Sequence, residues 1–136
     1  MANKATLVDS NVLLDLVTGD PATAYGSQEA LTAARQDGPV AINPIVYAEV
    51  SIRYETADEC DKVFPESHLQ RLPLPWEAAF VAGKAFLAYR RAGGSRTAPL
   101  PDFFIGAHAA VAGLRLLTRD AAHYRTYFPS VELMMP

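Results

Sequence analysis

The chain has 136 residues, of which 50% are hydrophobic and 20% are charged, and its formal net charge is −3. This length and composition fit one compact domain and exclude a disordered or low-complexity chain. A net negative charge argues against a protein that coats nucleic acid, although a bound metal ion would reverse the local field at a substrate site. Cys60 is the single cysteine and has no internal disulfide partner, so we expect a reducing, cytoplasmic environment. Neither a leader with a cleavage site nor a membrane-length apolar run is evident, so we expect no export or membrane insertion.

The first half of the chain predicts short strands that each lead into helices. Residues 5–8 are apolar and β-branched, which favours a buried strand. Gly19 and Pro21 are expected to close the helix that follows, whereas Asn43 and Pro44 are suited to cap and begin a later helix. The expected elements are a strand at 5–8, helices at 12–17 and 25–36, a strand at 40–42, and a helix from 44 to about 54.

The second half continues this alternation. A helix with an acid-rich, solvated face is expected first, and a long helix ending at Gly93 and Gly94 follows it. Residues 93–99 read as a flexible polar loop, and Pro101 opens the next helix. The expected elements are helices at 57–64, 75–91, 101–113 and 121–127, a short edge strand at 70–72, and strands at 115–118 and 131–134.

Alternating strands and helices with short loops predict an α/β fold, in which a parallel sheet is covered by helices on both faces. Ligands of such folds bind beyond the carboxyl ends of the strands. Asp9 and Asp120 come directly after two expected strands, and Glu49 and Asp102 lie in apolar helical patterns. Four carboxylates converging at one edge of a sheet repel one another unless a cation binds them. Oxygen ligands of this kind favour a divalent metal such as Mg²⁺.

Each of these acids also has a simpler interpretation. Asp9 and Asp120 are good helix caps, and Asp102 suits the first turn of a helix, where it complements the dipole. Glu49 lies one helical turn before Arg53, with which it can form a surface ion pair. We favour a metal site because all four occur at positions that this architecture brings together.

Other polar residues are candidates for supporting roles. Some side chains next to the acids can hold a carboxylate in place, and several basic side chains are candidates to meet phosphates, with a solvated face as the alternative. The supporting candidates are Ser10, Asn11 and Thr118, and the basic ones are Arg53, Lys84, Arg90, Arg91 and Arg96. Asp15 is a weak outer candidate that faces solvent or a neighbour. His68, His108 and His123 lack the spacing of metal ligands, and Cys60 reads as a small apolar residue.

Four segments of the chain together resemble the PIN-domain ribonucleases, and most of all the VapC toxins of toxin–antitoxin pairs. The matching segments, in order, are LVDSNVLLDL, INPIVYAEV, LPDFFIGAHA and LRLLTRD, the last followed by Tyr124. The resemblance implies a single PIN domain over residues 1–136, with a three-layer α/β/α sandwich around a mostly parallel sheet of about five strands.

The resemblance also implies an activity and partners. Asp9, Glu49, Asp102 and Asp120 correspond to the four acids of the family's metal site, which binds Mg²⁺ or Mn²⁺. The implied activity is metal-assisted hydrolysis of RNA phosphodiester bonds by an endoribonuclease, the toxin of a type II toxin–antitoxin system. Proteins of this family are typically homodimers that are inhibited by a cognate VapB-like antitoxin, which inserts a basic side chain into the acidic site.

Two other functions are compatible with parts of the pattern. A phosphorylated receiver domain also gathers acids and Mg²⁺ on a parallel sheet, but Ser10 and Asn11 stand where it would need a second acid beside Asp9. A catalytically silent PIN-like binding module in RNA metabolism would keep the fold without the reaction. Activity with Mn²⁺ that a chelator removes separates this module from a nuclease.

Overall fold

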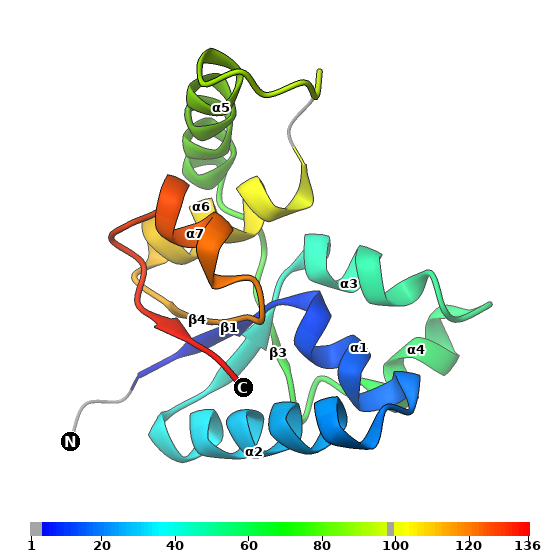
Figure 1. Cartoon of the computed structure of the whole chain (residues 1–136). Coiled ribbons are helices and arrows are strands. Elements are labelled where there is room, and N and C mark those ends of the chain that lie inside the picture. The colour runs from blue at the N-terminus through cyan, green and yellow to red at the C-terminus, as the bar shows by residue number, and fades with distance from the viewer. Residues whose placement is uncertain (1–3, 98–99) are drawn as a thin grey trace.

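The computed structural model describes residues 4–97 and 100–136 of the chain. Its centre is a five-stranded sheet in the order β3-β2-β1-β4-β5, and every neighbouring pair of strands is parallel (Figure 1). The predicted parallel α/β sheet is therefore confirmed. The strands are β1 (Thr6–Val8), β2 (Val40–Ile42), β3 (Gln70–Arg71), β4 (Arg115–Leu117) and β5 (Leu133–Met134).

Helices form the outer layers around this sheet. Helix α2 runs along one side of the sheet, and α6 and α7 lie on the other (Figure 1). Helix α5 packs on α6 and projects from the rest of the molecule. The helices are α1 (Ser10–Thr18), α2 (Pro21–Asp37), α3 (Pro44–Ser51), α4 (Ala57–Val63), α5 (Trp76–Arg91), α6 (Pro101–Ala112) and α7 (Ala121–Tyr127). In the described residues, none of them is long and apolar enough to cross a membrane.

The start of α2 is the largest difference from the sequence prediction. The helix was expected at 25–36, but it begins at Pro21 because Asp20 caps it, accepting a hydrogen bond from the backbone N of Ala22 at 3.1 Å. Pro21 therefore opens this helix rather than closing the previous one. Gly19 does end α1, since it adopts the left-handed conformation with φ 89°.

The remaining boundaries differ from the prediction by a few residues. Helix α3 ends at Ser51 rather than near residue 54, because the chain tightens there into a turn in which the backbone N of Arg53 donates to the carbonyl of Val50. Helix α7 has the predicted bounds. The predicted loop at 93–99 includes residues 98 and 99, which lie outside the described residues.

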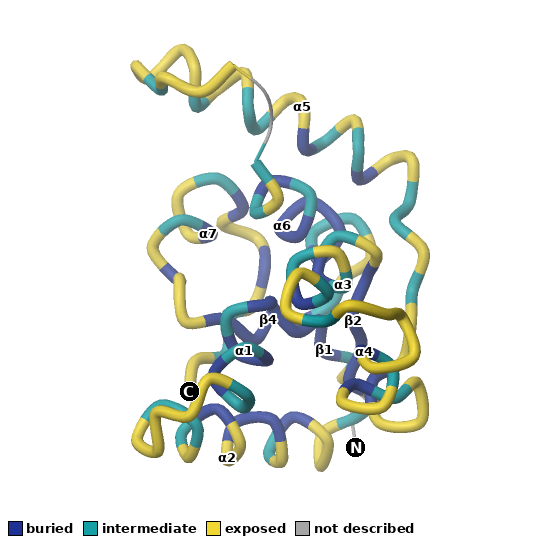
Figure 2. Tube along the Cα trace, turned by 90° about the vertical axis from the view of Figure 1, so that its right-hand side faces the viewer, coloured by how far each residue is buried: buried dark blue, intermediate teal, exposed yellow. Residues whose placement is uncertain are grey.

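The core surrounds the three central strands. Every residue of β1, β2 and β4 is buried, whereas the edge strand β3 is exposed, and the buried positions line the inside of the trace in Figure 2. Gly106 of α6 lies so close to the ring of Phe128 that an added Cβ would clash with it. A small residue at this position lets α6, the helix that carries Asp102, pack closely against Phe128.

Candidate metal centre

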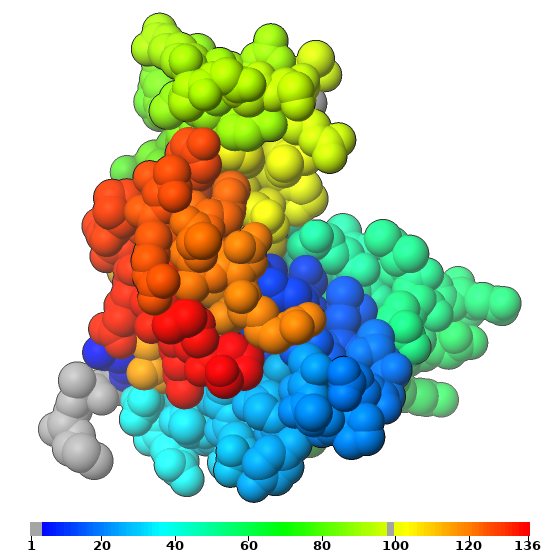
Figure 3. Space-filling view, in the orientation of Figure 1, coloured from blue at the N-terminus to red at the C-terminus, as the bar shows by residue number. Residues whose placement is uncertain are grey.

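The sheet topology places the ends of β1 and β4 side by side. Val8 pairs with Leu117 in the parallel register, so the residues that follow, Asp9 and Thr118, emerge together at the carboxyl edge. The backbone N of Asp9 donates to the carbonyl of Leu117 at 2.9 Å, which continues the ladder by one residue. The start of α1, dark blue in Figure 3, reaches the surface between α3 and the orange region around residue 120. Two central strands thus deliver polar side chains to one edge.

Asp9 is a buried carboxylate that receives four hydrogen bonds. It is 3% exposed, and its Oδ1 accepts from the backbone N of Ser10 at 2.8 Å. Its Oδ2 accepts from Thr118 Oγ1 at 2.8 Å, from the Tyr124 hydroxyl at 3.0 Å and from Asn11 Nδ2 at 3.3 Å. Asp9 is also the N-cap of α1, so the helix-cap interpretation is correct for this residue and coexists with its place in the acidic cluster.

Tyr124 is a contributor that the sequence analysis did not assign to the site. Its side chain is fully buried beneath Asp9, and burial, followed by the charge of Asp9, raises its pKa far above the ordinary value for tyrosine. The phenol therefore stays protonated and serves as a hydrogen-bond donor. The available signal was its position four residues after Asp120, one turn into an apolar helix at the carboxyl edge of the sheet.

Glu49 and Asp102 are half-buried and have fewer partners than Asp9. Burial raises the pKa of Glu49, and the charges of Asp9 and Asp102 add to this, while a hydrogen bond from Ser10 Oγ to Glu49 Oε1 at 2.9 Å opposes it. Burial also raises the pKa of Asp102, as do the charges of Asp9 and Asp120, against an opposing effect of His123. These mutual effects indicate that the four acids share one electrostatic environment.

Asp120 is the most exposed of the four acids. Its backbone N donates to Thr118 Oγ1 at 3.0 Å, but its side chain makes no capping bond to α7. Asp120 therefore occupies the N-cap position of α7 without capping the helix through its side chain. Thr118 Oγ1 consequently links two of the acids, because the same hydroxyl also donates to Asp9.

Two further expectations are corrected by the contacts. Arg53 does not pair with Glu49; its Nη2 donates to the carbonyl of Val17 at 3.4 Å, and Glu49 turns to Ser10 instead. Asp15 does not face solvent: it is 4% exposed and forms an ion pair with Arg119 at 2.8 Å. The sequence analysis expected Asp15 to face either solvent or a neighbouring residue, and the structure shows the second: Asp15 faces Arg119.

The basic candidates lie away from these contacts. Lys84 Nζ sits 5.2 Å from the ring centre of Phe80 on α5, and Arg90 Nη1 donates to the backbone carbonyl of Arg96 at 2.5 Å. Arg91 is exposed in the last turn of the same helix. Their positions make them available to solvent or to a ligand.

The histidines and Cys60 have ordinary surroundings. His108 is buried, its Nδ1 lies 3.0 Å from Asn43 Nδ2, and burial lowers its pKa. His123 packs against aromatic rings, and His68 is exposed. Cys60 is 1% exposed in the core, as expected for a small apolar residue.

The donor set fits a hard divalent cation such as Mg²⁺. Carboxylate oxygens are its preferred protein ligands, and the partly buried acids lack enough positive partners to offset their charge. Among the described residues, no three or more acidic, His or Cys side chains are close enough to form a ready-made cage. Mg²⁺ does not require one, because it usually keeps several waters and binds proteins through one or two carboxylates.

Comparisons with known proteins agree with this fold. A sequence model of the PIN domain matches residues 6–129. The chain belongs to the PIN-domain family. Ribonuclease VapC10 of Mycobacterium tuberculosis is 32% identical to it over 130 residues, which cover 96% of this chain and 90% of that protein. The resemblance inferred from the four sequence segments is confirmed.

Solved structures with the same fold come from VapBC toxin–antitoxin complexes. VapBC2 from Rickettsia felis, bound to a DNA fragment from their promoter, has a TM-score of 0.74 at 16% identity, covering 96% of this chain and 98% of that one. VapBC-1 from nontypeable Haemophilus influenzae has a TM-score of 0.72 at 13% identity, with coverage of 96% and 97%. At these identities the structural likeness establishes the fold alone.

Proposed function

We propose that this protein is a divalent-metal-dependent endoribonuclease that acts as the toxin of a type II toxin–antitoxin system. The observation that carries the proposal is the group of four acids at the carboxyl edge of a PIN fold, two of which have a pKa raised by burial and by neighbouring acids. The identity with Ribonuclease VapC10 over 96% of the chain supports the same activity.

Asp9, Glu49, Asp102 and Asp120 are the proposed ligands of Mg²⁺ or Mn²⁺. The cation would supply charge stabilisation for the phosphodiester and activate water for its hydrolysis. Asp9 is the fixed member, since four hydrogen bonds hold its two oxygens. Glu49, Asp102 and Asp120 are more exposed than Asp9, so their side chains can adjust their conformations to the cation and the substrate.

The supporting residues orient these carboxylates through their second partners. Ser10 bonds Asp9 through its backbone N and Glu49 through its hydroxyl, which sets the spacing of two acids from different helices. The Thr118 hydroxyl donates to Asp9 and accepts from the backbone N of Asp120, and Asn11 Oδ1 accepts from the backbone N of Arg119. These contacts hold the segment that leads to Asp120 next to Asp9. Such partners commonly change metal affinity or activity by about 10- to 100-fold when they are removed.

Arg53, Lys84, Arg91 and Arg96 are the proposed contacts to RNA phosphates. The last turn of α5 carries Arg90 and Arg91, and Arg96 follows in the segment after this helix. Arg90 Nη1 donates to the backbone carbonyl of Arg96, which holds Arg96 near the basic end of α5. Guanidinium groups suit phosphate oxygens because they bind them through paired hydrogen bonds.

The proposed partners are a VapB-like antitoxin and a second copy of this chain. A cavity of about 310 Å³ lies between α1, α2 and the end of α4, and it has both apolar and polar lining residues, which suits an amphipathic antitoxin segment. We propose that a basic residue of such a segment pairs with the acids near the start of α1. The apolar lining includes Leu13, Leu16, Val17, Leu31, Phe64 and Leu69.

The catalytically silent binding module is the second candidate, and one experiment separates the two. We expect the purified protein to cleave RNA with Mn²⁺, to stop in excess EDTA, and to lose at least about 100-fold of its rate in Asp9→Asn and Asp102→Asn. Glu66→Gln, a change at an exposed acid, is the control and should cleave normally. Unfolding curves show whether each variant is folded. Full cleavage by both folded variants, or in EDTA, would refute the proposed function.

A further inference from the structure

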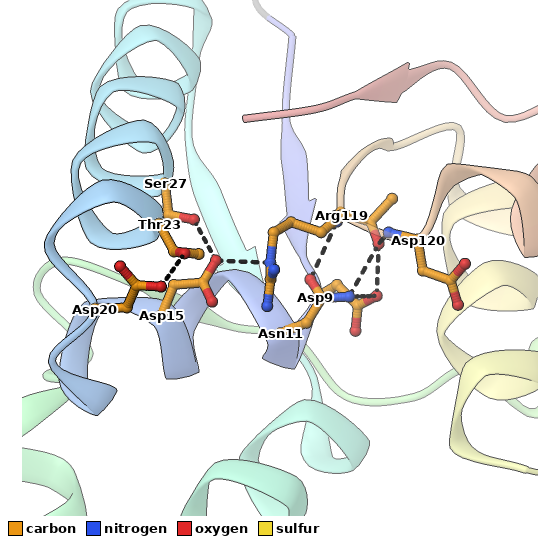
Figure 4. Close-up of polar contacts among 9 residues, drawn as sticks. Asp9, Asn11, Asp15, Asp20, Thr23, Ser27, Arg119 and Asp120 are labelled. Carbon is orange, nitrogen blue, oxygen red and sulfur yellow. Dashed lines mark hydrogen bonds and ion pairs between the residues drawn. The ribbon is translucent and has the colours of Figure 1, made fainter.

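Asp15 is a buried carboxylate that the proposed reaction does not use directly. Its side chain is 6% exposed, and a charge at such a depth requires a partner. Arg119 Nε supplies one at 2.8 Å, and Ser27 Oγ of α2 donates to the same oxygen, Oδ2, at 2.7 Å. Figure 4 shows the guanidinium of Arg119 extended from the loop after β4 towards Asp15 on α1.

Arg119 is also fixed through its backbone. Its N donates to Asn11 Oδ1 at 3.2 Å, and Asn11 Nδ2 lies 3.4 Å from Thr118 Oγ1 (Figure 4). Asn11 and Asp15 are four residues apart on α1 and therefore share one face of the helix. One helix face thus holds both the backbone and the side chain of Arg119.

Asp120 is the next residue, and its carboxylate has no such support of its own. In the part of the chain that the structure describes, the Asp120 side chain makes no hydrogen bond or ion pair, and only its backbone N is held, by Thr118. Where this carboxylate points therefore depends on how the residues before it are fixed. Two of these residues are anchored through their side chains: Thr118 is buried and donates to Asp9, and Arg119 reaches back to Asp15 on α1.

We propose that the Asp15–Arg119 ion pair, steadied by Ser27, is a positioning device that holds the Asp120 carboxylate at the metal centre. This inference rests on the proposed function, because it assumes that Asp120 contributes to cation binding. The pair also has an electrostatic consequence. Asp15 engages the guanidinium of Arg119 at α1, so that this charge is not available to pair with the acids and compete with the cation.

The test measures Mn²⁺ affinity by calorimetry in the absence of RNA, at a temperature where every variant is folded. Arg119→Gln should weaken binding about 10-fold, the lower end of what outer partners of metal sites contribute. Asp15→Asn leaves no unpaired buried charge, so we expect it to fold even where Arg119→Gln does not. It also frees the Arg119 guanidinium to compete with the cation, so its Mn²⁺ affinity should fall at least as far as that of Arg119→Gln. Arg119→Lys keeps a charge for Asp15 and should recover most of the affinity.

A double-mutant cycle shows whether the effect passes through Asp120. Asp120→Asn alone should weaken Mn²⁺ binding, and adding Arg119→Gln to it should change the affinity by less than about twofold. Hydrogen exchange should report the same coupling: the amides of residues 119 and 120 should exchange faster in Arg119→Gln than in the wild type.

The chain offers a matched control at the other end of β4. Arg115 and Asp37 form an ion pair at 2.9 Å in which, again, one side chain is buried (9% exposed) and the other is half-exposed (50%). Asp37→Asn therefore removes the half-exposed partner of a similar pair, although Arg115 keeps a hydrogen bond to Thr6. It should lower the Tm while leaving Mn²⁺ affinity unchanged, which is the pattern of a purely structural pair.

Three results would overturn the inference, and they differ from failure of the proposed function. Wild-type Mn²⁺ affinity in Arg119→Gln and Asp15→Asn, alongside weakened binding in Asp120→Asn, would reject the positioning role while leaving the metal site intact. Full additivity in the cycle would mean that the pair acts through another residue, such as Asn11. An equal loss in Asp37→Asn would show a general effect of lower stability. A wild-type protein that binds no Mn²⁺ would instead remove the proposed function, and this inference with it.

Discussion

The hydroxyl of Tyr124 offers a sharp test of how the acidic centre is held together. Tyr124→Phe removes one buried oxygen and leaves the ring in place, so that Asp9 Oδ2 loses a donor at 3.0 Å and keeps those from Thr118 and Asn11. A hydrogen bond to a charged group contributes about 1.5–3 kcal/mol. For a domain of this size, the Tm should fall on the order of 5–15 °C. Because Tyr124 helps to orient Asp9, a proposed metal ligand, Mn²⁺ affinity should also fall, by about 10-fold.

The matched control is Tyr127→Phe in the same helix. The ring of Tyr127 packs in the same aromatic cluster, and its hydroxyl bonds no other described residue, so its loss should shift the Tm by no more than about 2 °C. Thermal unfolding and Mn²⁺ calorimetry on both variants give the comparison. If Tyr124→Phe behaves like Tyr127→Phe in both measurements, the buried hydroxyl does not support Asp9, and the reasoning about this contact fails.

Two further predictions follow from the charge of the centre and one from the groove beside it. The pKa of Asp102 is raised above its ordinary value of 3.8, so its contribution to stability is present below that value and lost as the pH rises through the folded-state pKa. Asp102→Asn should therefore raise the metal-free Tm at pH 7 and leave it unchanged near pH 3.5; equal shifts at both pH values would contradict this. Mn²⁺ at about 100 times its Kd should stabilise the wild type by roughly 2.7 kcal/mol, and a flat wild-type titration in thermal unfolding would exclude binding. Leu16→Asp should weaken binding of the proposed VapB-like antitoxin without slowing RNA cleavage, and a normal antitoxin affinity would place the partner elsewhere.

The order and type of the elements could be predicted because local signals were strong. The short runs that form β1, β2 and β4 are mostly apolar, and every residue in them is buried, as is typical of central parallel strands. The start of α2 was missed because Gly19, Asp20 and Pro21 together suit both the end of one helix and the beginning of the next. The capping bond from Ala22 to Asp20 decides between them, and it is visible only in three dimensions.

The candidate site was predictable to the extent that strand ends bring residues together. Asp9 and Asp120 follow β1 and β4, and their proximity follows from a sheet order in which these strands are neighbours. The role of Tyr124 depends on a contact across 115 residues of sequence, and that of Asp15 on one with the loop after β4. The spacing of Tyr124 from Asp120 indicates a place near the site but not this contact, and no spacing pattern in the sequence indicates the partner of Asp15.

The acids of the centre are not equivalent, and the difference explains why a cation suits the site. Asp9 receives hydrogen bonds from four groups, so the protein itself supplies most of what this carboxylate needs. Glu49 and Asp102 lose water on folding and gain little in return, which raises the pKa of each and disfavours the charged form. A divalent ion supplies the missing positive charge, and so, in its absence, does a basic side chain of an inhibitor. The same imbalance therefore accounts for the proposed metal dependence and for the proposed inhibition, because both ligands relieve a repulsion that the folded protein leaves uncompensated.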